Sequence, residues 1–343
     1  MNIALLGLPQ AGKRTLFKLL TGRNVKSDRK PSEVVEGIAP IRDSRVDSLD
    51  GLYKPKSRVY AENHFVLCPD AVTDGSSHDW LAAAEKCDLL CLVVRAFDSE
   101  QVYHPLGSVD PERDIANLKD ELLLADLQLI EKRLERIGKE SRSGLTTPQK
   151  LEQQALGCFQ GLLEGDRRLS DCELDRQYLD ATRHLSLLTL KPIVVVYNVS
   201  EDSLASPCAS NAVVVSCLIE QEISELESPE EQLEYMETIG LESSGVDRVN
   251  QLVYQALGLM SFYTVGKDEC RAWTIRRNST APVAAGKIHS DIQRGFIRVE
   301  VIKYDDLMQA GSEQAVKDQG KVQTKGKDYV IEDGDICHFL FNV

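Results

Sequence analysis

A glycine-rich loop near the N-terminus holds the residues whose types and spacing most clearly indicate chemistry. It reads Gly-Leu-Pro-Gln-Ala-Gly-Lys-Arg-Thr over residues 7–15, after an apolar run at residues 3–6 and before apolar residues at helical spacing from Leu16. A strand, a glycine-rich loop and a helix in this order are typical of a phosphate-binding loop. Backbone N–H groups and the helix start would face phosphate oxygens, and Lys13 would reach the β- and γ-phosphates. The nucleotide-binding residues predicted in this loop are Gly7, Pro9, Gln10, Ala11, Gly12, Lys13, Arg14 and Thr15.

Arg14 departs from the usual pattern of such loops. The residue after the lysine is normally Ser or Thr, whose hydroxyl group binds magnesium, whereas a guanidinium group cannot coordinate a cation. Two interpretations stay open. Arg14 either supplies the positive charge that magnesium would provide, so that a di- or triphosphate binds without metal, or it merely fills the metal position. Magnesium is therefore doubtful as a cofactor.

A second polar segment follows another buried strand. Asn198-Val199-Ser200-Glu201 comes directly after the apolar run at residues 193–197. Ligands of α/β sheets bind at the carboxyl ends of the strands, so this segment is a candidate for reading the nucleotide base. The sequence predicts Asn198 and Glu201 as nucleotide-binding residues beside the phosphate loop.

The elements that must position these residues belong to an α/β protein. Short, nearly continuous apolar runs predict strands buried on both faces of a parallel sheet. Residues 111–188 lack a strand signal but repeat leucines at three- and four-residue steps, which predicts an antiparallel helical pair inserted into the sheet domain. After residue 260 the pattern changes to a small α+β domain, in which Asp333-Gly334 is predicted to join residues 329–331 and 336–341 in a hairpin. The apolar runs lie at residues 3–6, 65–68, 89–94, 193–197 and 213–215.

Charge and cysteine usage exclude several classes of protein. The formal net charge of -14 over 343 residues rules out binding of nucleic acid by the chain as a whole, so any RNA contact must be local and no DNA partner is expected. The nine cysteines and six histidines show no zinc spacing, which predicts no metal site and reduced thiols in a cytosol. The apolar run at residues 89–94 is far shorter than the ~20 residues that cross a bilayer, so no membrane segment is expected.

Ten segments spread over nearly the whole chain resemble the YchF/Obg-like ATPases. The C-terminal ones are the most specific: Arg-Ala-Trp-Thr at 271–274, Ala-Gly-Lys-Ile-His at 285–289, Gly-Phe-Ile-Arg at 295–298, and residues 326–343, which begin Gly-Lys-Asp-Tyr and end Phe-Leu-Phe-Asn-Val. The other matching segments are residues 7–17, 45–49, 92–95, 125–127, 187–192 and 198–201.

The resemblance implies a domain organisation and a class of ligand. A discontinuous P-loop GTPase-like domain would cover residues 1–110 and 188–258, with a helical insertion at 111–187. Residues 259–343 would form a TGS domain of ubiquitin-like β-grasp form, which is associated with ribosome or RNA binding. The family carries Asn-x-x-Glu where GTPases carry the aspartate that reads guanine, so ATP is favoured over GTP.

The departures from the family concern its hydrolytic parts. Arg14 replaces the magnesium-binding serine, and the Asp-x-x-Gly motif aligns with Leu-Cys-Pro-Asp at residues 67–70. The switch threonine aligns with Pro31, and the glycine-rich switch is shortened to residues 73–79. These positions hold magnesium or sense the γ-phosphate, so we expect hydrolysis to be weak or lost. His104 matches a family histidine but is predicted to be structural.

Basic residues of the C-terminal domain are candidates for RNA contact. They accompany Trp273 and Phe296, which could stack on bases but could equally belong to the core. Solvated faces and a packed core are the default interpretation, and the RNA role depends mainly on the resemblance. The predicted RNA-binding residues are Arg276, Arg277, Lys287, His289 and Arg294.

These expectations combine into an ATP- or GTP-binding regulatory protein that contacts the ribosome or RNA through its TGS domain and helical arm. Two alternatives stay open. The first is an active magnesium-dependent ATPase or GTPase in which Thr15 or Asp70 restores the metal site. The second is an RNA or protein adaptor whose pocket stays empty.

Overall fold

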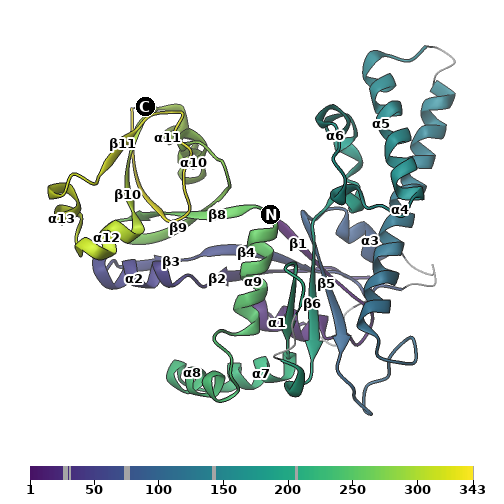
Figure 1. Cartoon of the computed structure of the whole chain (residues 1–343), viewed down its shortest axis with the longest axis horizontal. Coiled ribbons are helices and arrows are strands. Elements are labelled where there is room, and N and C mark those ends of the chain that lie inside the picture. Colours follow the sequence, from purple (N-terminus) through teal and green to yellow (C-terminus); the bar gives the residue numbers. More distant parts are fainter. Residues whose placement is uncertain (26–29, 31, 73–77, 141–143, 205–207, 343) are drawn as a thin grey trace. The chain divides into compact units, whose positions relative to one another are not determined.

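The computed structural model divides the chain into two compact units, each built from two stretches of sequence (Figure 1). It describes residues 1–343 except 26–29, 31, 73–77, 141–143, 205–207 and 343. Pro31 and most of the shortened switch, residues 73–77, therefore lie outside the described residues. Unit 1 consists of Met1–Gly37 and His64–Val253, and unit 2 of Ile38–Asn63 and Tyr254–Val343.

A six-stranded sheet with strand order β2-β4-β1-β5-β6-β7 forms the framework of unit 1. β1 pairs in parallel with β4 and with β5, β5 with β6, and β6 with β7, so the predicted parallel sheet is confirmed. The carboxyl ends of these strands lie at one edge, where the polar segments after each strand gather. The strands are β1 (Asn2–Leu6), β2 (Val35–Ile41), β4 (Ala61–Leu67), β5 (Leu89–Ala96), β6 (Ile193–Val199) and β7 (Ala212–Val215).

Helices follow the strands of unit 1, as an α/β fold requires. The first begins directly at the phosphate loop and buries Leu16, Phe17 and Leu20 at helical spacing. The acidic stretch at residues 220–237 forms two helices with largely exposed carboxylates. These helices are α1 (Lys13–Thr21), α3 (Asp79–Ala84), α7 (Cys217–Glu225), α8 (Pro229–Thr238) and α9 (Gly245–Ala256).

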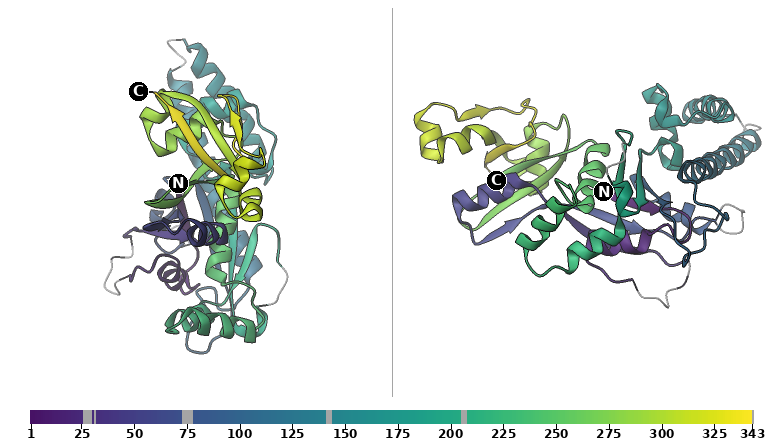
Figure 2. Two further views of the ribbon diagram at one scale, coloured as in Figure 1. Left: turned by 90° about the vertical axis from the view of Figure 1, so that its left-hand side faces the viewer. Right: turned by 60° about the horizontal axis from the view of Figure 1, so that its bottom comes forward.

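The region between β5 and β6 forms the predicted helical pair. α4 (Pro111–Glu140) and α5 (Thr147–Glu164) lie side by side in both Figure 1 and Figure 2. Arg133 donates two hydrogen bonds to Glu152, at 2.7 and 2.8 Å, while Glu140 accepts one from Gln149. Residue numbers in the two contacts rise along α4, from 133 to 140, while they fall along α5, from 152 to 149. The two helices therefore run antiparallel.

A buried aspartate ties the base of this helical pair to the chain that returns to the sheet. The carboxylate of Asp126 accepts hydrogen bonds from the backbone N–H groups of Leu188 and Thr189 at 2.9 and 2.7 Å. The Thr189 hydroxyl adds a third at 2.6 Å. Burial raises the pKa of Asp126, and these hydrogen bonds oppose the shift. A short α6 (Arg176–Thr182) and the turns η2 (Leu169–Asp171), η3 (Arg183–Leu185) and η4 (Leu188–Leu190) complete this region.

Unit 2 contains a second six-stranded sheet, with order β11-β10-β12-β8-β9-β3. Residues 38–63, which the sequence analysis assigned to the nucleotide-binding domain, cluster with this unit and supply its edge strand, because β3 pairs in parallel with β9. Its strands are β3 (Ser57–Val59), β8 (Leu259–Val265), β9 (Glu269–Arg276), β10 (Phe296–Lys303), β11 (Gln323–Lys325) and β12 (Asp335–Phe341). Its helices are α2 (Ser44–Tyr53), α10 (Ala281–Ile288), α11 (Ser290–Arg294), α12 (Tyr304–Ala310) and α13 (Glu313–Asp318).

The hairpin predicted around Asp333 and Gly334 is wrong. β12 pairs antiparallel with β10 and parallel with β8, while residues 329–331 form only an isolated bridge between Val330 and Thr280. The turn residues do take a turn-like conformation, since Gly334 has a φ of 89° and donates its N–H to the Ser261 carbonyl. Long-range pairing on both sides of β12 therefore overrides the local hairpin signal.

None of the described helices combines the length and apolar character needed to cross a membrane.

The packing of the helical pair leads to a stability prediction. Phe159 on α5 is fully buried against Ile130, Ile137 and Leu156, so Phe159→Ala should lower the free energy of unfolding of unit 1 by about 3–5 kcal/mol. Urea unfolding followed by circular dichroism measures this loss. Leu124→Ala on α4 is the control, because that side chain is 49% exposed and its truncation should change the free energy by about 0.5 kcal/mol or less. An equal loss in both variants would contradict the packing.

Candidate functional site

The glycine-rich loop connects β1 to α1 and curls tightly at its two glycines. A Cβ atom on Gly7 would lie 2.2 Å from the Val93 carbonyl oxygen, so no side chain fits there. Gly12 has a φ of 97°, and a Cβ atom there would lie 2.3 Å from the Asn198 side-chain nitrogen. Only glycine permits this close approach of the loop to β5 and β6.

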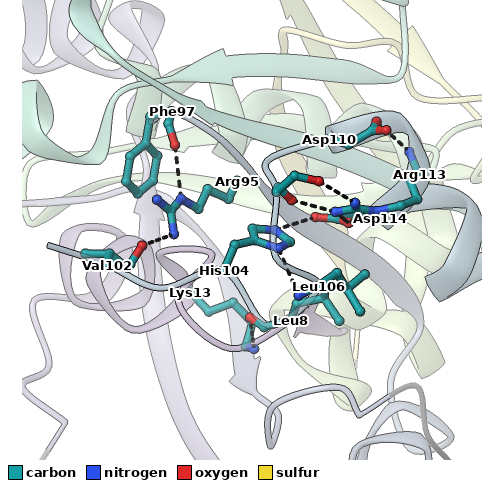
Figure 3. A network of polar contacts seen from close by, with 11 residues as sticks. Leu8, Lys13, Arg95, Phe97, Val102, His104, Leu106, Asp110, Arg113 and Asp114 are labelled. Atoms are coloured by element: carbon teal, nitrogen blue, oxygen red, sulfur yellow. Dashed lines mark hydrogen bonds and ion pairs between the residues drawn. The ribbon is translucent and has the colours of Figure 1, made fainter. Parts of the chain in front are cut away.

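Lys13 lies at the start of α1 with its ammonium group turned back into the loop. Its side chain is only 3% exposed, and Nζ donates to the carbonyl oxygens of Gly7 and of Leu8, the latter at 3.2 Å. A third bond, 2.5 Å long, joins Nζ to Asp70 Oδ1. Burial lowers the pKa of Lys13, and the Asp70 carboxylate opposes that shift. Figure 3 shows Lys13 beside Leu8.

A cavity of about 780 Å³ lies at the carboxyl edge of the unit 1 sheet. The structure brings every predicted nucleotide-binding residue except Gly7 into its lining, although the two predicted segments lie far apart in the sequence. Lining side chains come from the phosphate loop, the exit of β4, the loop after β5, the end of β6 and the start of α7. The lining residues are Leu8, Pro9, Gln10, Ala11, Gly12, Lys13, Arg14, Thr15, Asp70, Phe97, Asp98, Ser99, Gln101, Val102, Asn198, Val199, Ser200, Glu201, Ser216, Cys217, Leu218, Ile219, Gln221 and Glu222.

Asn198 joins three walls of this cavity. Its side-chain nitrogen donates to the Ala11 carbonyl at 3.1 Å, and its side-chain oxygen accepts from the Cys217 N–H at 3.0 Å. The buried amide therefore holds the phosphate loop and the start of α7 to the end of β6. Glu201, three residues later, is exposed at the beginning of η5 (Glu201–Ser203).

Arg95 and the loop that it shapes are not among the site residues predicted from the sequence. The buried guanidinium group donates to the carbonyl oxygens of Phe97 and Val102 at 3.0 and 2.9 Å (Figure 3). It also donates to the Ser99 carbonyl oxygen at 3.4 Å and lies 4.7 Å from the centre of the Phe97 ring. Arg95 thereby folds residues 97–102 into a cavity wall. A usable signal existed, because polar residues follow the buried β5 strand at its carboxyl end.

His104 is buried and hydrogen-bonded outside the cavity lining (Figure 3). Its Nδ1 accepts from the Leu106 N–H at 3.2 Å, so Nε2 carries the proton and donates to Asp114, 3.0 Å away. The second oxygen of Asp114 accepts from Arg113 at 2.9 Å. The imidazole therefore joins the chain after β5 to the first turn of α4.

Arg14 and Asp70 give the cavity two opposite charges. Arg14 is exposed and forms no ion pair within the part of the chain that the structure describes, whereas Asp70 is paired with Lys13. Leu67, which aligns with the aspartate of the family motif, packs into the core and offers no oxygen ligand. Among the described residues there is no group of three or more His, Cys, Asp or Glu side chains that could hold a metal ion.

The predicted RNA-binding residues lie in unit 2 and all five are exposed. The aromatic residues beside them are largely internal: Phe296 is buried, and Trp273 stacks on Phe262 with ring centres 6.5 Å apart. Arg294 is paired with Asp291 at 2.7 Å. The five residues lie at the end of β9 (Arg276, Arg277), on α10 (Lys287), between α10 and α11 (His289) and at the end of α11 (Arg294).

Comparisons with known proteins agree with this architecture over the whole chain. The YchF-GTPase_C family model, described as a protein of unknown function (DUF933), matches residues 259–342. The ribosome-binding ATPase YchF of Bacillus subtilis is 35% identical over 366 residues, covering all of both chains. The Obg-like ATPase 1 of Rattus norvegicus is 33% identical over 369 residues, covering 100% of this chain and 92% of the rat protein.

A solved structure has the same fold. The YchF GTPase of Schizosaccharomyces pombe superposes with a TM-score of 0.85 at 30% sequence identity, covering 99% of this chain and 97% of the yeast one. The α/β P-loop fold expected from the sequence is thereby confirmed. These full-length matches, together with the phosphate loop and the sheet that carries it, make the chain a member of the YchF family.

Proposed function

We propose that this chain is a nucleotide-binding regulatory protein that acts at the ribosome and hydrolyses its nucleotide weakly or not at all. The observation that carries the proposal is the cavity of unit 1, which the phosphate loop and residues 198–201 line together. Relatives named ribosome-binding ATPases support the role at the ribosome. The ligand is an adenine or guanine nucleotide. The nine free cysteines fit a reducing cytoplasm.

In this proposal the phosphate chain lies against residues 8–15 and the start of α1, and the base lies against residues 198–201 and the start of α7. Asn198 is already engaged by Ala11 and Cys217, so it positions the cavity wall. Glu201 remains free to read the base. A carboxylate in an Asn-x-x-Glu segment is the family variant that favours adenine, so we favour ATP over GTP.

Weak hydrolysis is proposed from the charges that replace the metal-binding groups. Arg14 has no oxygen to offer magnesium. Asp70 is held 2.5 Å from Lys13, so it would have to leave that ammonium group before it could serve as a relocated metal ligand. Of the groups that could restore an active magnesium-dependent ATPase, only the Thr15 hydroxyl has no such obstacle.

The route to the ribosome is proposed through the C-terminal domain and the helical arm. Residues 259–343 would act as a TGS domain and residues 111–187 as the arm, beside a nucleotide-binding domain of residues 1–110 and 188–258 from which residues 38–63, clustered with unit 2, are excepted. The exposed basic residues on β9, α10 and α11 are the groups available for contact with RNA phosphates.

Loss of the Lys13 ammonium group is expected to abolish stabilisation by nucleotide. A ligand that binds only the folded state at a hundred times its Kd adds about 2.7 kcal/mol, which should raise the Tm of the wild type by about 5 °C or more. Differential scanning fluorimetry with ATP, ADP, GTP and GDP measures the rise, which should be larger for the adenine nucleotides and absent in Lys13→Ala.

Lys18→Ala is the matched control, because Lys18 is exposed on the same helix outside the cavity lining. Its rise in Tm should equal that of the wild type. An equal rise in Lys13→Ala would contradict binding at the phosphate loop. No rise in the wild type with any of the four nucleotides would instead favour the nucleotide-free adaptor.

Binding is expected to be nearly independent of magnesium and to depend on Arg14. Titration calorimetry of the wild type should give affinities within about threefold in magnesium and in chelator. Arg14→Ser should lose at least about tenfold in chelator, since a hydrogen bond to a charged group contributes about 1.5–3 kcal/mol. Arg167→Ser, an exposed guanidinium group outside the cavity lining, is the control. Strong magnesium dependence in the wild type, or magnesium-dependent phosphate release that Lys13→Ala abolishes, would support the active ATPase.

Co-sedimentation with ribosomes tests the proposed RNA contact. Reversing two exposed charges in Arg276→Glu/Arg277→Glu should weaken binding at least about tenfold and flatten its dependence on salt, because fewer phosphate contacts are made. Lys54→Glu/Lys317→Glu changes the same number of charges at exposed positions on other elements of unit 2 and should bind like the wild type. Equal weakening in both double variants would indicate a general charge effect and overturn the assignment.

A further inference from the structure

The ammonium group of Lys13 has no donor left for a ligand. An ammonium group carries three N–H donors and no acceptor. In this structure the three donors go to the carbonyl oxygens of Gly7 and Leu8 and to the carboxylate of Asp70. A phosphate oxygen can therefore bind Lys13 only where one of these acceptors gives way.

Asp70 is the anionic acceptor of the three, and the backbone on both sides of it is fixed. The Cys68 N–H donates to the Leu5 carbonyl at 3.3 Å, and the Ala71 N–H donates to the Gly7 carbonyl at 3.0 Å. Cys68 and Ala71 are buried, whereas the Asp70 side chain is 40% exposed and lines the cavity. The carboxylate is thus held between the ammonium group and the open part of the cavity.

The carboxylate is an addition to the family pattern. Asp70 aligns with the glycine of Asp-x-x-Gly, which has no side chain, so this chain places a negative charge where the pattern has none. A phosphate loop directs its lysine to the β- and γ-phosphates. Lys13 therefore meets a protein carboxylate at the end of the cavity where the phosphate chain would terminate.

Two anions cannot share this end of the cavity without repulsion. A γ-phosphate oxygen bound by Lys13 would lie one hydrogen-bond length from Nζ, as Asp70 Oδ1 already does at 2.5 Å. A β-phosphate oxygen bound by Lys13 would lie equally close to Asp70, but a triphosphate adds the γ-phosphate as a further anion at the same ammonium group, in a partly buried site where like charges repel strongly. A β-phosphate needs only one donor, and the Leu8 carbonyl bond at 3.2 Å is the weakest of the three to be given up.

We propose that Asp70 acts as a built-in substitute for the terminal phosphate, so that this chain binds nucleoside diphosphates in preference to triphosphates. The inference rests on the proposed nucleotide site. With a diphosphate bound, the ammonium group of Lys13 lies between the β-phosphate and the Asp70 carboxylate. The charge of Lys13 is then balanced by the β-phosphate and the Asp70 carboxylate, so a third phosphate is not needed.

Titration calorimetry with ADP and ATP in chelator tests the proposal, because without magnesium the repulsion is not masked. The wild type should bind ADP at least about tenfold more tightly than ATP. Asp70→Asn removes the charge at nearly constant shape and should bring the two affinities within about threefold, mainly by improving that for ATP. Asp70→Gly restores the family residue and should act in the same direction.

Asp98→Asn is the matched control. Asp98 is an exposed carboxylate in the same cavity lining but does not contact Lys13. Removing its charge should leave the ratio of the two affinities near that of the wild type. An equal change in this variant would mean that the total charge of the cavity, rather than the Lys13–Asp70 pair, sets the preference, and would overturn the proposal.

The outcomes separate this inference from the function on which it rests. Binding of both nucleotides with equal affinity by the wild type, lost in Lys13→Ala, would overturn the role of Asp70 while keeping the nucleotide site. Binding of neither nucleotide would overturn both. The ratio of the ADP and ATP affinities is measured on the wild type alone. The test therefore remains decisive even where a substitution at residue 70 prevents folding.

Discussion

A buried ammonium group sets the geometry of the cavity in unit 1. The charge of Lys13 is almost completely removed from water and is held by two loop carbonyls and one carboxylate. An unpaired charge at such a position costs several kcal/mol, so a ligand that displaces one acceptor must supply another. The contacts also join the end of β1 to the exit of β4. The contacts of Lys13 that hold the shape of the phosphate loop are therefore the same contacts that a bound anion must replace.

Arg14 and Asp70 change the sources of positive and negative charge in the cavity. An ordinary phosphate loop obtains its positive charge partly from a magnesium ion and its negative charge from the ligand, and both can dissociate. Here a guanidinium group and a carboxylate are attached to the protein, one beside the lysine in sequence and the other beside it in space. On the functions proposed above, the charge of the cavity becomes independent of free metal. Such a site suits a protein that senses a nucleotide better than one that turns it over.

The walls of the cavity depend on buried polar residues rather than on the loop alone. Asn198 joins the phosphate loop to the start of α7, and Arg95 gathers the carbonyl groups of the loop after β5. Asn198 bonds backbone groups from segments distant in sequence, whereas Arg95 bonds carbonyl groups two to seven residues along the chain. Losing either one would leave buried polar atoms unpaired, at a cost of about 1–3 kcal/mol per group. The cavity is thus preorganised by the same hydrogen bonds that hold unit 1 together.

Local patterns in the sequence were sufficient for much of the fold and for the identity of the loop. Continuous apolar runs mark strands buried on both faces, leucines at three- and four-residue steps mark α4 and α5, and Gly7, Gly12 and Lys13 mark the loop, because each signal arises from residues close in the chain. The hairpin at Asp333 and Gly334 was mispredicted, since β12 obtains its partners β10 and β8 from distant segments. The placement of residues 38–63 with unit 2 depends on the same kind of long-range pairing. Only the tertiary structure could reveal that Asp70 meets Lys13, because 57 residues separate them and a carboxylate carries no sequence signal of which ammonium group it will neutralise.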